Sequence, residues 1–108
     1  MQASLSTVPI DAALVFERAA DLFGLLSSSM RLRIVSELCR GELSVGQLRE
    51  RVDTTQPNLS QHLAVLYRAG ILARRREGSQ VHYQISHAGV AAICRTVCID
   101  FAMQDGPG

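Results

Sequence analysis

The fold is indicated most clearly by residues 56–80, QPNLSQHLAVLYRAGILARRREGSQ. Thr55, just before it, is a good helix N-cap, and Pro57 is tolerated in a first turn, where its missing N–H costs no hydrogen bond. Leucines at helical spacing give the predicted helix one apolar face: Leu59, Leu63 and Leu66. Gly70 is typical of a helix end. We therefore expect a helix that runs to Ala69 and packs by one face only.

The rest of this helix is polar, and a basic hairpin follows it. The polar side chains are Gln56, Asn58, Ser60, Gln61, His62 and Arg68. Asparagine and glutamine amides can pair with the edge of adenine in the major groove, and a serine hydroxyl can contact several bases. Two predicted strands, residues 71–76 and 81–85, flank a glycine-containing turn. Arg75 and Arg76 on this hairpin are expected to contact the DNA backbone or the minor groove.

Four further helices are predicted around this unit. They are expected over residues 12–26, 30–40, 45–52 and 87–102. Ser44 and Gln47 form a capping-box pattern at the start of the third of these, and Ser86 is the expected cap of the last. That last helix is apolar nearly all round, which is typical of a helix buried in an interface. We expect part of the first helix's broad apolar face to meet a partner as well.

The order of these elements is that of a winged helix-turn-helix. We expect a mainly α fold with about five helices, two strands that form a β-hairpin wing, and a dimeric assembly. The chain has 108 residues, which is the length of one domain. That domain is expected over residues 11–103, with flexible ends at residues 1–10 and 104–108.

Charge is concentrated in the middle of the chain. The net charge is only +1, and every cation except histidine is an arginine. Residues 54–88 carry four arginines against one glutamate, a local patch that suits a polyanion such as DNA. No apolar run is long enough for a membrane span, and the N-terminus lacks the pattern of a signal peptide. We therefore expect a cytoplasmic protein without a membrane partner.

At this point the chain resembles the ArsR/SmtB-type bacterial repressors. The stretch quoted above carries the resemblance, together with SSSMRLRIVSEL at residues 27–38, GELSVGQL at 41–48 and RRREGSQVHY at 74–83. The resemblance implies a homodimer built from the first and last helices. It also implies binding to a near-palindromic double-stranded DNA operator, and release of that operator by an inducer.

Repressors of this family differ mainly in what they sense. The arsenic-type site of the family places two cysteines where this chain has Ser44 and Gly46, so that site is absent. The zinc-type site aligns with His87, Gly89, Asp100 and Met103, of which two are plausible ligands. Zinc prefers four ligands in a tetrahedral array, so a zinc site is not expected here.

The three cysteines, Cys39, Cys94 and Cys98, are the remaining candidates. Cys94 and Cys98 are four residues apart on one helix, with β-carbons about 5–6 Å apart. A disulfide requires roughly 3.5–4.5 Å, so a bond between them would strain the helix. As(III) or another soft metal ion could span them, with or without Cys39. In a second arrangement, which needs no metal ion, Cys39 forms a disulfide with Cys98 or, less favourably, with Cys94.

The second arrangement is preferred because of the resemblance. Family members that sense sulfide-derived species or oxidants have one cysteine on the second helix and one on the last, at positions that match Ser36 and Ala102 here. If those two helices pack antiparallel, moving each cysteine position by one turn along its helix leads to Cys39 and Cys98. This arrangement predicts a repressor released by thiol modification, without a cofactor or bound metal. In a third interpretation the cysteines are packing residues, because free cysteine is often buried.

Two other classes of function compete with a DNA-binding repressor. A thiol enzyme would need a cysteine of low pKa beside a cation and a base, and no such constellation is visible. A winged helix used for protein contact would have a recognition surface without cations, whereas Arg68 and the hairpin arginines make this surface basic.

Overall fold

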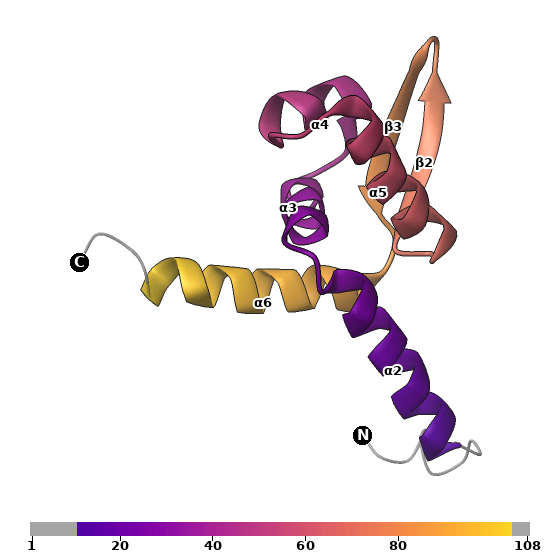
Figure 1. Ribbon diagram of the computed structural model, residues 1–108, viewed down its shortest axis with the longest axis vertical. Helices are drawn as coiled ribbons and strands as arrows, with labels where there is room; N and C mark the ends of the chain where they lie inside the picture. The colour runs from indigo at the N-terminus through magenta and orange to yellow at the C-terminus, as the bar shows by residue number, and fades with distance from the viewer. Residues whose placement is uncertain (1–10, 105–108) are drawn as a thin grey trace.

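The computed structural model describes residues 11–104, which form five helices and a three-stranded antiparallel sheet (Figure 1). The helices are α2 Ala12–Leu26, α3 Ser29–Leu38, α4 Val45–Arg51, α5 Gln56–Arg68 and α6 Ala88–Gln104. The strands are β1 Leu43–Ser44, β2 Leu72–Glu77 and β3 Gln80–Ile85, in the order β1-β3-β2. The predicted winged helix-turn-helix is confirmed, with α4 and α5 as the helix pair and β2 and β3 as the wing.

The helix starts follow local capping chemistry. The Ser44 hydroxyl accepts from the Gln47 N–H at 3.1 Å, while the Gln47 side chain accepts from the Ser44 N–H at 2.9 Å, which is the predicted capping box. Thr55 caps α5 by accepting from the backbone N–H of Asn58 at 3.3 Å. At the other end, Gly70 takes a φ of 80°, which ends α5 and turns the chain into β2.

The predicted cap of the last helix is wrong. The Ser86 hydroxyl does not face the first turn of α6, because it donates to the carbonyl of Gly70 at 3.0 Å. The Nδ1 atom of His87 instead accepts from the Val90 N–H at 3.3 Å. Helix α6 also includes Gln104, which was predicted to belong to a flexible end. The other predicted flexible residues, 1–10 and 105–108, lie outside the described residues.

The third strand was not predicted. Strand β1 has only two residues, and Leu43 pairs with Tyr83 while Ser44 pairs with His82. A segment this short shows no alternation of apolar and polar residues in the sequence. Its partner strand is distant in the chain, so the pairing depends on the tertiary fold. The effect is to join the start of α4 to the wing.

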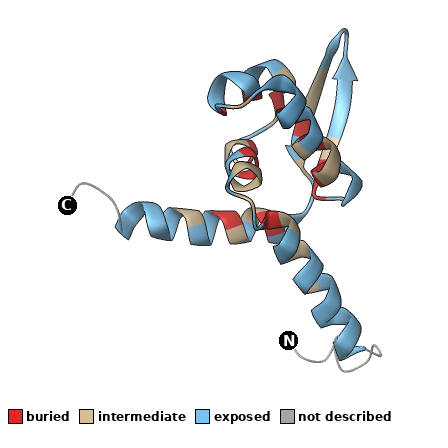
Figure 2. Cartoon of the chain, in the orientation of Figure 1, coloured by how far each residue is buried: buried red, intermediate tan, exposed pale blue. Residues whose placement is uncertain are grey.

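The hydrophobic core lies where α3, α4, α5 and the sheet meet, with the first turns of α6 beneath them (Figure 2). The predicted leucine stripe of α5 lies within it, since Leu59, Leu63 and Leu66 are at most 1% exposed. Ile34 and Val35 of α3 are also fully buried. Burial of one face of α5 leaves its polar face free on the outside of the domain.

Helices α2 and α6 extend away from this core in different directions (Figure 1). Along these arms, large apolar side chains remain exposed, among them Phe16 at 73%, Phe23 at 56%, Phe101 at 60% and Met103 at 78%. The only buried residues of these two helices are Val90 and Cys94 in α6 and Leu26 in α2. Within residues 11–104, no helix combines the length and apolar character that crossing a membrane requires.

Candidate nucleic-acid interface and thiol cluster

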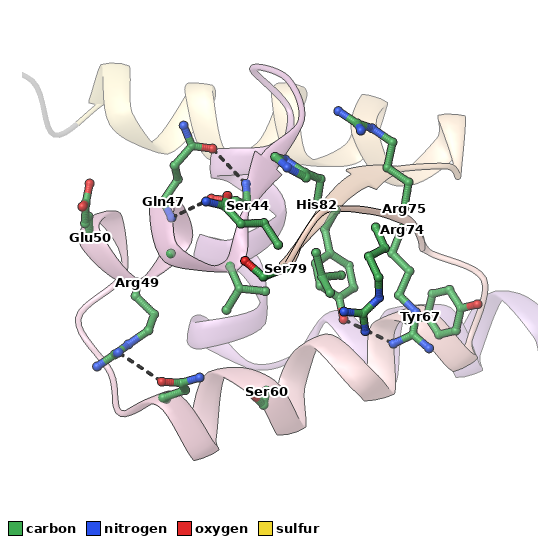
Figure 3. Close-up of a pocket in the computed structure, with 17 residues that line it drawn as sticks. Ser44, Gln47, Arg49, Glu50, Ser60, Tyr67, Arg74, Arg75, Ser79 and His82 are labelled. Atoms are coloured by element: carbon green, nitrogen blue, oxygen red, sulfur yellow. Dashed lines mark hydrogen bonds between the residues drawn. The ribbon is translucent and has the colours of Figure 1, made fainter.

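The polar face of α5 borders an open groove between α4, α5 and the wing (Figure 3). Five of the six predicted α5 contact residues are exposed: Gln56, Asn58, Ser60, Gln61 and Arg68. Two of them are held by neighbours. The Gln56 side chain accepts from Arg49 of α4 at 3.2 Å, and the Asn58 amide donates to the Thr54 hydroxyl at 2.7 Å. The first turn of α5 is thus supported from α4 and from the preceding turn.

His62 is the exception among the predicted α5 residues. It is half-buried, and its Nδ1 atom accepts from the Nε–H of Arg31 on α3 at 3.1 Å. Burial and then the charge of Arg31 lower the pKa of His62. This side chain therefore connects α5 to α3, and the structure does not group it with the exposed polar residues of α5.

The three wing arginines line the groove but have different partners. Arg74 stacks on the ring of Tyr67 at 4.0 Å from its centroid and donates to the Tyr83 hydroxyl at 3.5 Å (Figure 3). This cation–π contact holds a positive charge beside α5. Arg74 was missing from the predicted contact residues. The alternation of side chains along β2 could have identified Arg74, because Arg74 and Arg76 lie on the same face of the strand.

Arg75 is engaged in ion pairs. Its guanidinium donates to both carboxylate oxygens of Glu42, at 2.8 and 2.9 Å, and lies 3.5 Å from Glu77. The hydrogen bond from Arg75 lowers the pKa of the Glu42 carboxyl. Arg76 makes no ion pair within residues 11–104. Of the two predicted wing contacts, Arg76 is therefore free for a phosphate, whereas Arg75 links the wing to the segment before β1.

The three cysteines lie in the region where the end of α3 packs on α6. The sulfur atoms of Cys94 and Cys98 are 3.5 Å apart. Burial raises the pKa of the Cys94 thiol to about 12, and neighbouring Cys98 and Cys39 contribute to that rise. Cys94 is buried, while Cys39 and Cys98 are half-buried. Cys39, which follows α3, thus lies close enough to Cys94 to affect its ionisation.

The metal-site alternatives find no support in the geometry. Within residues 11–104, no group of three or more His, Cys, Asp or Glu side chains is placed to hold a metal ion. A soft-metal site made of Cys39, Cys94 and Cys98 is therefore not favoured. The two remaining candidates for a zinc-type site have other roles, since His87 caps α6 and Asp100 accepts from the Gln104 amide at 3.1 Å.

Fold and surface together define a winged helix-turn-helix regulator, and comparison with known proteins gives its family. Residues 28–74, which span α3 to the start of β2, match the family described as "Bacterial regulatory protein, arsR family". The chain is 37% identical over 86 residues to the biofilm growth-associated repressor of Xylella fastidiosa, covering 80% of this chain and 75% of that protein. The chain belongs to the arsR family, whose members are DNA-binding transcriptional regulators and not enzymes.

Solved structures agree with this assignment. Reduced HlyU from Vibrio cholerae superposes with a TM-score of 0.73 at 32% identity, covering 90% of this chain and 94% of that one. The repressor BigR from Xylella fastidiosa superposes with a TM-score of 0.71 at 30% identity, covering 92% and 100%. The similarity therefore extends beyond the helix-turn-helix to the terminal helices.

Proposed function

We propose that this protein is a cytoplasmic, homodimeric repressor that binds a near-palindromic operator and releases it when its thiols are modified by reactive sulfur species or oxidants. The observation that carries the sensing part is the proximity of Cys39, at the end of α3, to Cys94 of α6, whose sulfur lies 3.5 Å from that of Cys98. The DNA-binding part rests on the family and on the exposed polar face of α5 beside a basic groove.

Helix α5 is the recognition helix in this proposal. Its N-terminal residues would lie in the major groove, where Gln61 and Asn58 can read adenine edges and Ser60 can contact neighbouring bases. Arg74 and Arg76 would contact the phosphate backbone along the adjacent wing, and Arg68 would do so from the end of α5. Glu42 and Arg75 would hold the wing at its angle to α5.

The exposed apolar side chains of α2 and α6 support the homodimer. A monomer in water would keep Phe16, Phe23 and Phe101 exposed along two arms, and soluble proteins seldom expose apolar patches of that extent. Two-fold pairing of these helices would bury them. It would also place two α5 helices side by side, at a spacing that matches successive turns of one DNA groove.

The thiol arrangement supports a cross-helix disulfide. A peroxide would oxidise one thiol to a sulfenic acid and leave as water or an alcohol, and a second thiol would then displace water to form the disulfide. With a polysulfide, a thiolate would attack a sulfur atom and form a persulfide, releasing a polysulfide that is one sulfur shorter. The second thiolate would then attack the cysteine sulfur of that persulfide, form the disulfide and displace hydrosulfide. Cys94 resists ionisation, so the first attack is expected at Cys39 or Cys98.

The structural effect of a disulfide depends on which two cysteines form it. A Cys94–Cys98 bond would constrain a single helix. A bond from Cys39 to Cys98, or to Cys94, would tie α3 to α6 and so couple the proposed dimer helix to the helix-turn-helix. Cys39 is half-buried and lines a small cleft with Arg40 and His87. We prefer Cys39–Cys98.

The test compares the reduced protein with samples treated with peroxide, polysulfide or arsenite, using mass spectrometry and operator-binding titrations on each sample. We expect a Cys39–Cys98 link and weaker operator binding. Cys39→Ser should bind the operator when reduced and should no longer respond. A normal response of Cys39→Ser, with loss of response in Cys94→Ser and Cys98→Ser, would move the sensor to α6. Wild-type responses in all three single variants would refute thiol sensing.

A further inference from the structure

The side chain of Arg31 connects three helices. It belongs to α3, and its Nε–H donates to Nδ1 of His62 on α5 at 3.1 Å. Its Nη1 group donates to the backbone carbonyl of Leu25 on α2, also at 3.1 Å. One half-buried guanidinium therefore contacts both the recognition helix and the end of the first helix.

The contact with α2 is of a kind that stabilises helix ends. Leu25 is the next-to-last residue of α2, so its carbonyl belongs to the last turn, where no further residue of the helix can donate to it. A cation at this position also opposes the partial negative charge of the helix C-terminus. Arg31 thus fixes the direction in which α2 leaves the domain.

The contact with α5 requires a particular form of His62. Because the Nε–H of Arg31 donates to Nδ1, that nitrogen must carry its lone pair, and the imidazole proton of the neutral ring must lie on Nε2. Protonation of His62 would remove the acceptor and place two positive charges together. His62 directly follows Gln61, so its bond to Arg31 holds the same turn of α5 that carries the proposed base-reading residues.

We propose that Arg31 is a positioning residue that sets the spacing of the two recognition helices, by locking α5 to the end of the α2 dimer helix through His62. This inference rests on the proposed function, because it takes operator binding and the participation of α2 in the homodimer as given. Arg31 acts through His62 and makes no contact with DNA. Loss of the Arg31 side chain should change the operator spacing that the protein prefers. The affinity for DNA in general should change less.

A double-mutant cycle tests the link. Arg31→Leu, His62→Phe and the double variant are titrated on the selected operator and on unrelated DNA, with Arg33→Leu as control. Arg33 is an exposed arginine of the same helix, so it matches the loss of charge. We expect each single variant to bind the operator about tenfold more weakly, and the double variant to lose no more than one single variant. Binding to unrelated DNA should stay unchanged, as should operator binding by Arg33→Leu.

Salt dependence and operator spacing separate positioning from other roles. In Arg31→Leu the slope of log affinity against log salt should equal that of the wild type, while preference among operators lengthened or shortened by one base pair should weaken. A slope shallower by about one would show a direct phosphate contact and overturn the inference. Additive losses in the cycle, or unchanged spacing preference, would also overturn it. If Arg31→Leu fails to fold, Arg31→Met with His62→Phe gives the same cycle, because a methionine side chain cannot donate to His62.

Wild-type controls distinguish a failure of the proposed function from a failure of the inference about Arg31. If the wild-type protein binds no selected DNA sequence in preference to unrelated DNA, the proposed function fails. If the wild type binds its operator and Arg31→Leu binds it equally well with the same spacing preference, only this inference fails.

Discussion

Three consecutive arginines of β2 have three different environments. Arg74 stacks on Tyr67, Arg75 is bound by Glu42, and Arg76 has no ion-pair partner within residues 11–104. The amino-acid sequence shows only a run of like charges, and strand alternation separates Arg75 from the other two. Partners such as Glu42 come from distant parts of the chain, so the roles of these arginines could be separated only in the folded structure.

This difference predicts unequal effects on DNA binding at the wing. Arg76→Ala should weaken binding to operator and unrelated DNA alike and make the salt slope shallower by about one, because it removes one phosphate contact. Arg75→Ala should leave that slope unchanged, since its guanidinium is engaged by Glu42. Affinity titrations over a range of salt concentrations measure both. An unchanged slope in Arg76→Ala would contradict the assignment of the wing.

We expect base reading by α5 to depend most on Gln61. It is exposed, and within residues 11–104 its side chain makes no hydrogen bond that would occupy the amide. Gln61→Ala should cost about 1–3 kcal/mol of operator binding, the range for a good bidentate base contact, and leave binding to unrelated DNA unchanged. Equal losses on operator and unrelated DNA would contradict a base-reading role.

At the scale of helices and strands, the parts that could be predicted are those with local causes. The caps at Ser44 and Thr55 and the leucine stripe of α5 depend on residues within one or two turns, so their sequence patterns were sufficient. Strand β1, the Glu42–Arg75 pair and the His62–Arg31 bond join residues more than thirty positions apart. Short-range patterns contain no information on such pairings, which is why the bond between Arg31 and His62 could not be predicted.

The α3–α5 link makes stability depend on pH. Burial and Arg31 hold the pKa of His62 below its ordinary value of 6.5, so the unfolded chain takes up this proton first as the pH falls. The contribution of neutral His62 to folding is therefore complete above pH 6.5 and is lost as the pH drops through the folded pKa. Urea unfolding of the wild type and of His62→Phe between pH 7.5 and 5 measures this effect. His62→Phe should have the shallower decline, and identical declines would contradict it.

In the molecule as a whole, the two terminal helices differ from the rest of the domain in how much apolar surface they expose. Its core is built around the helix-turn-helix and wing, while α2 and the outer part of α6 leave large aromatic and aliphatic side chains uncovered (Figure 2). The amino-acid sequence predicted these broad apolar faces from their helical spacing. How two copies would pair in the proposed homodimer could not be predicted, because such pairing depends on contacts between chains.

In the proposed function, two copies of the protein present two α5 helices and two wings to one operator. The most direct measurement is a hydroxyl-radical footprint of the full-length protein on DNA selected from a random pool. We predict a two-fold symmetric footprint, with half-site centres about 10–10.5 base pairs apart or a multiple of that distance. An asymmetric footprint, produced by a single copy on a single half-site, would contradict the account.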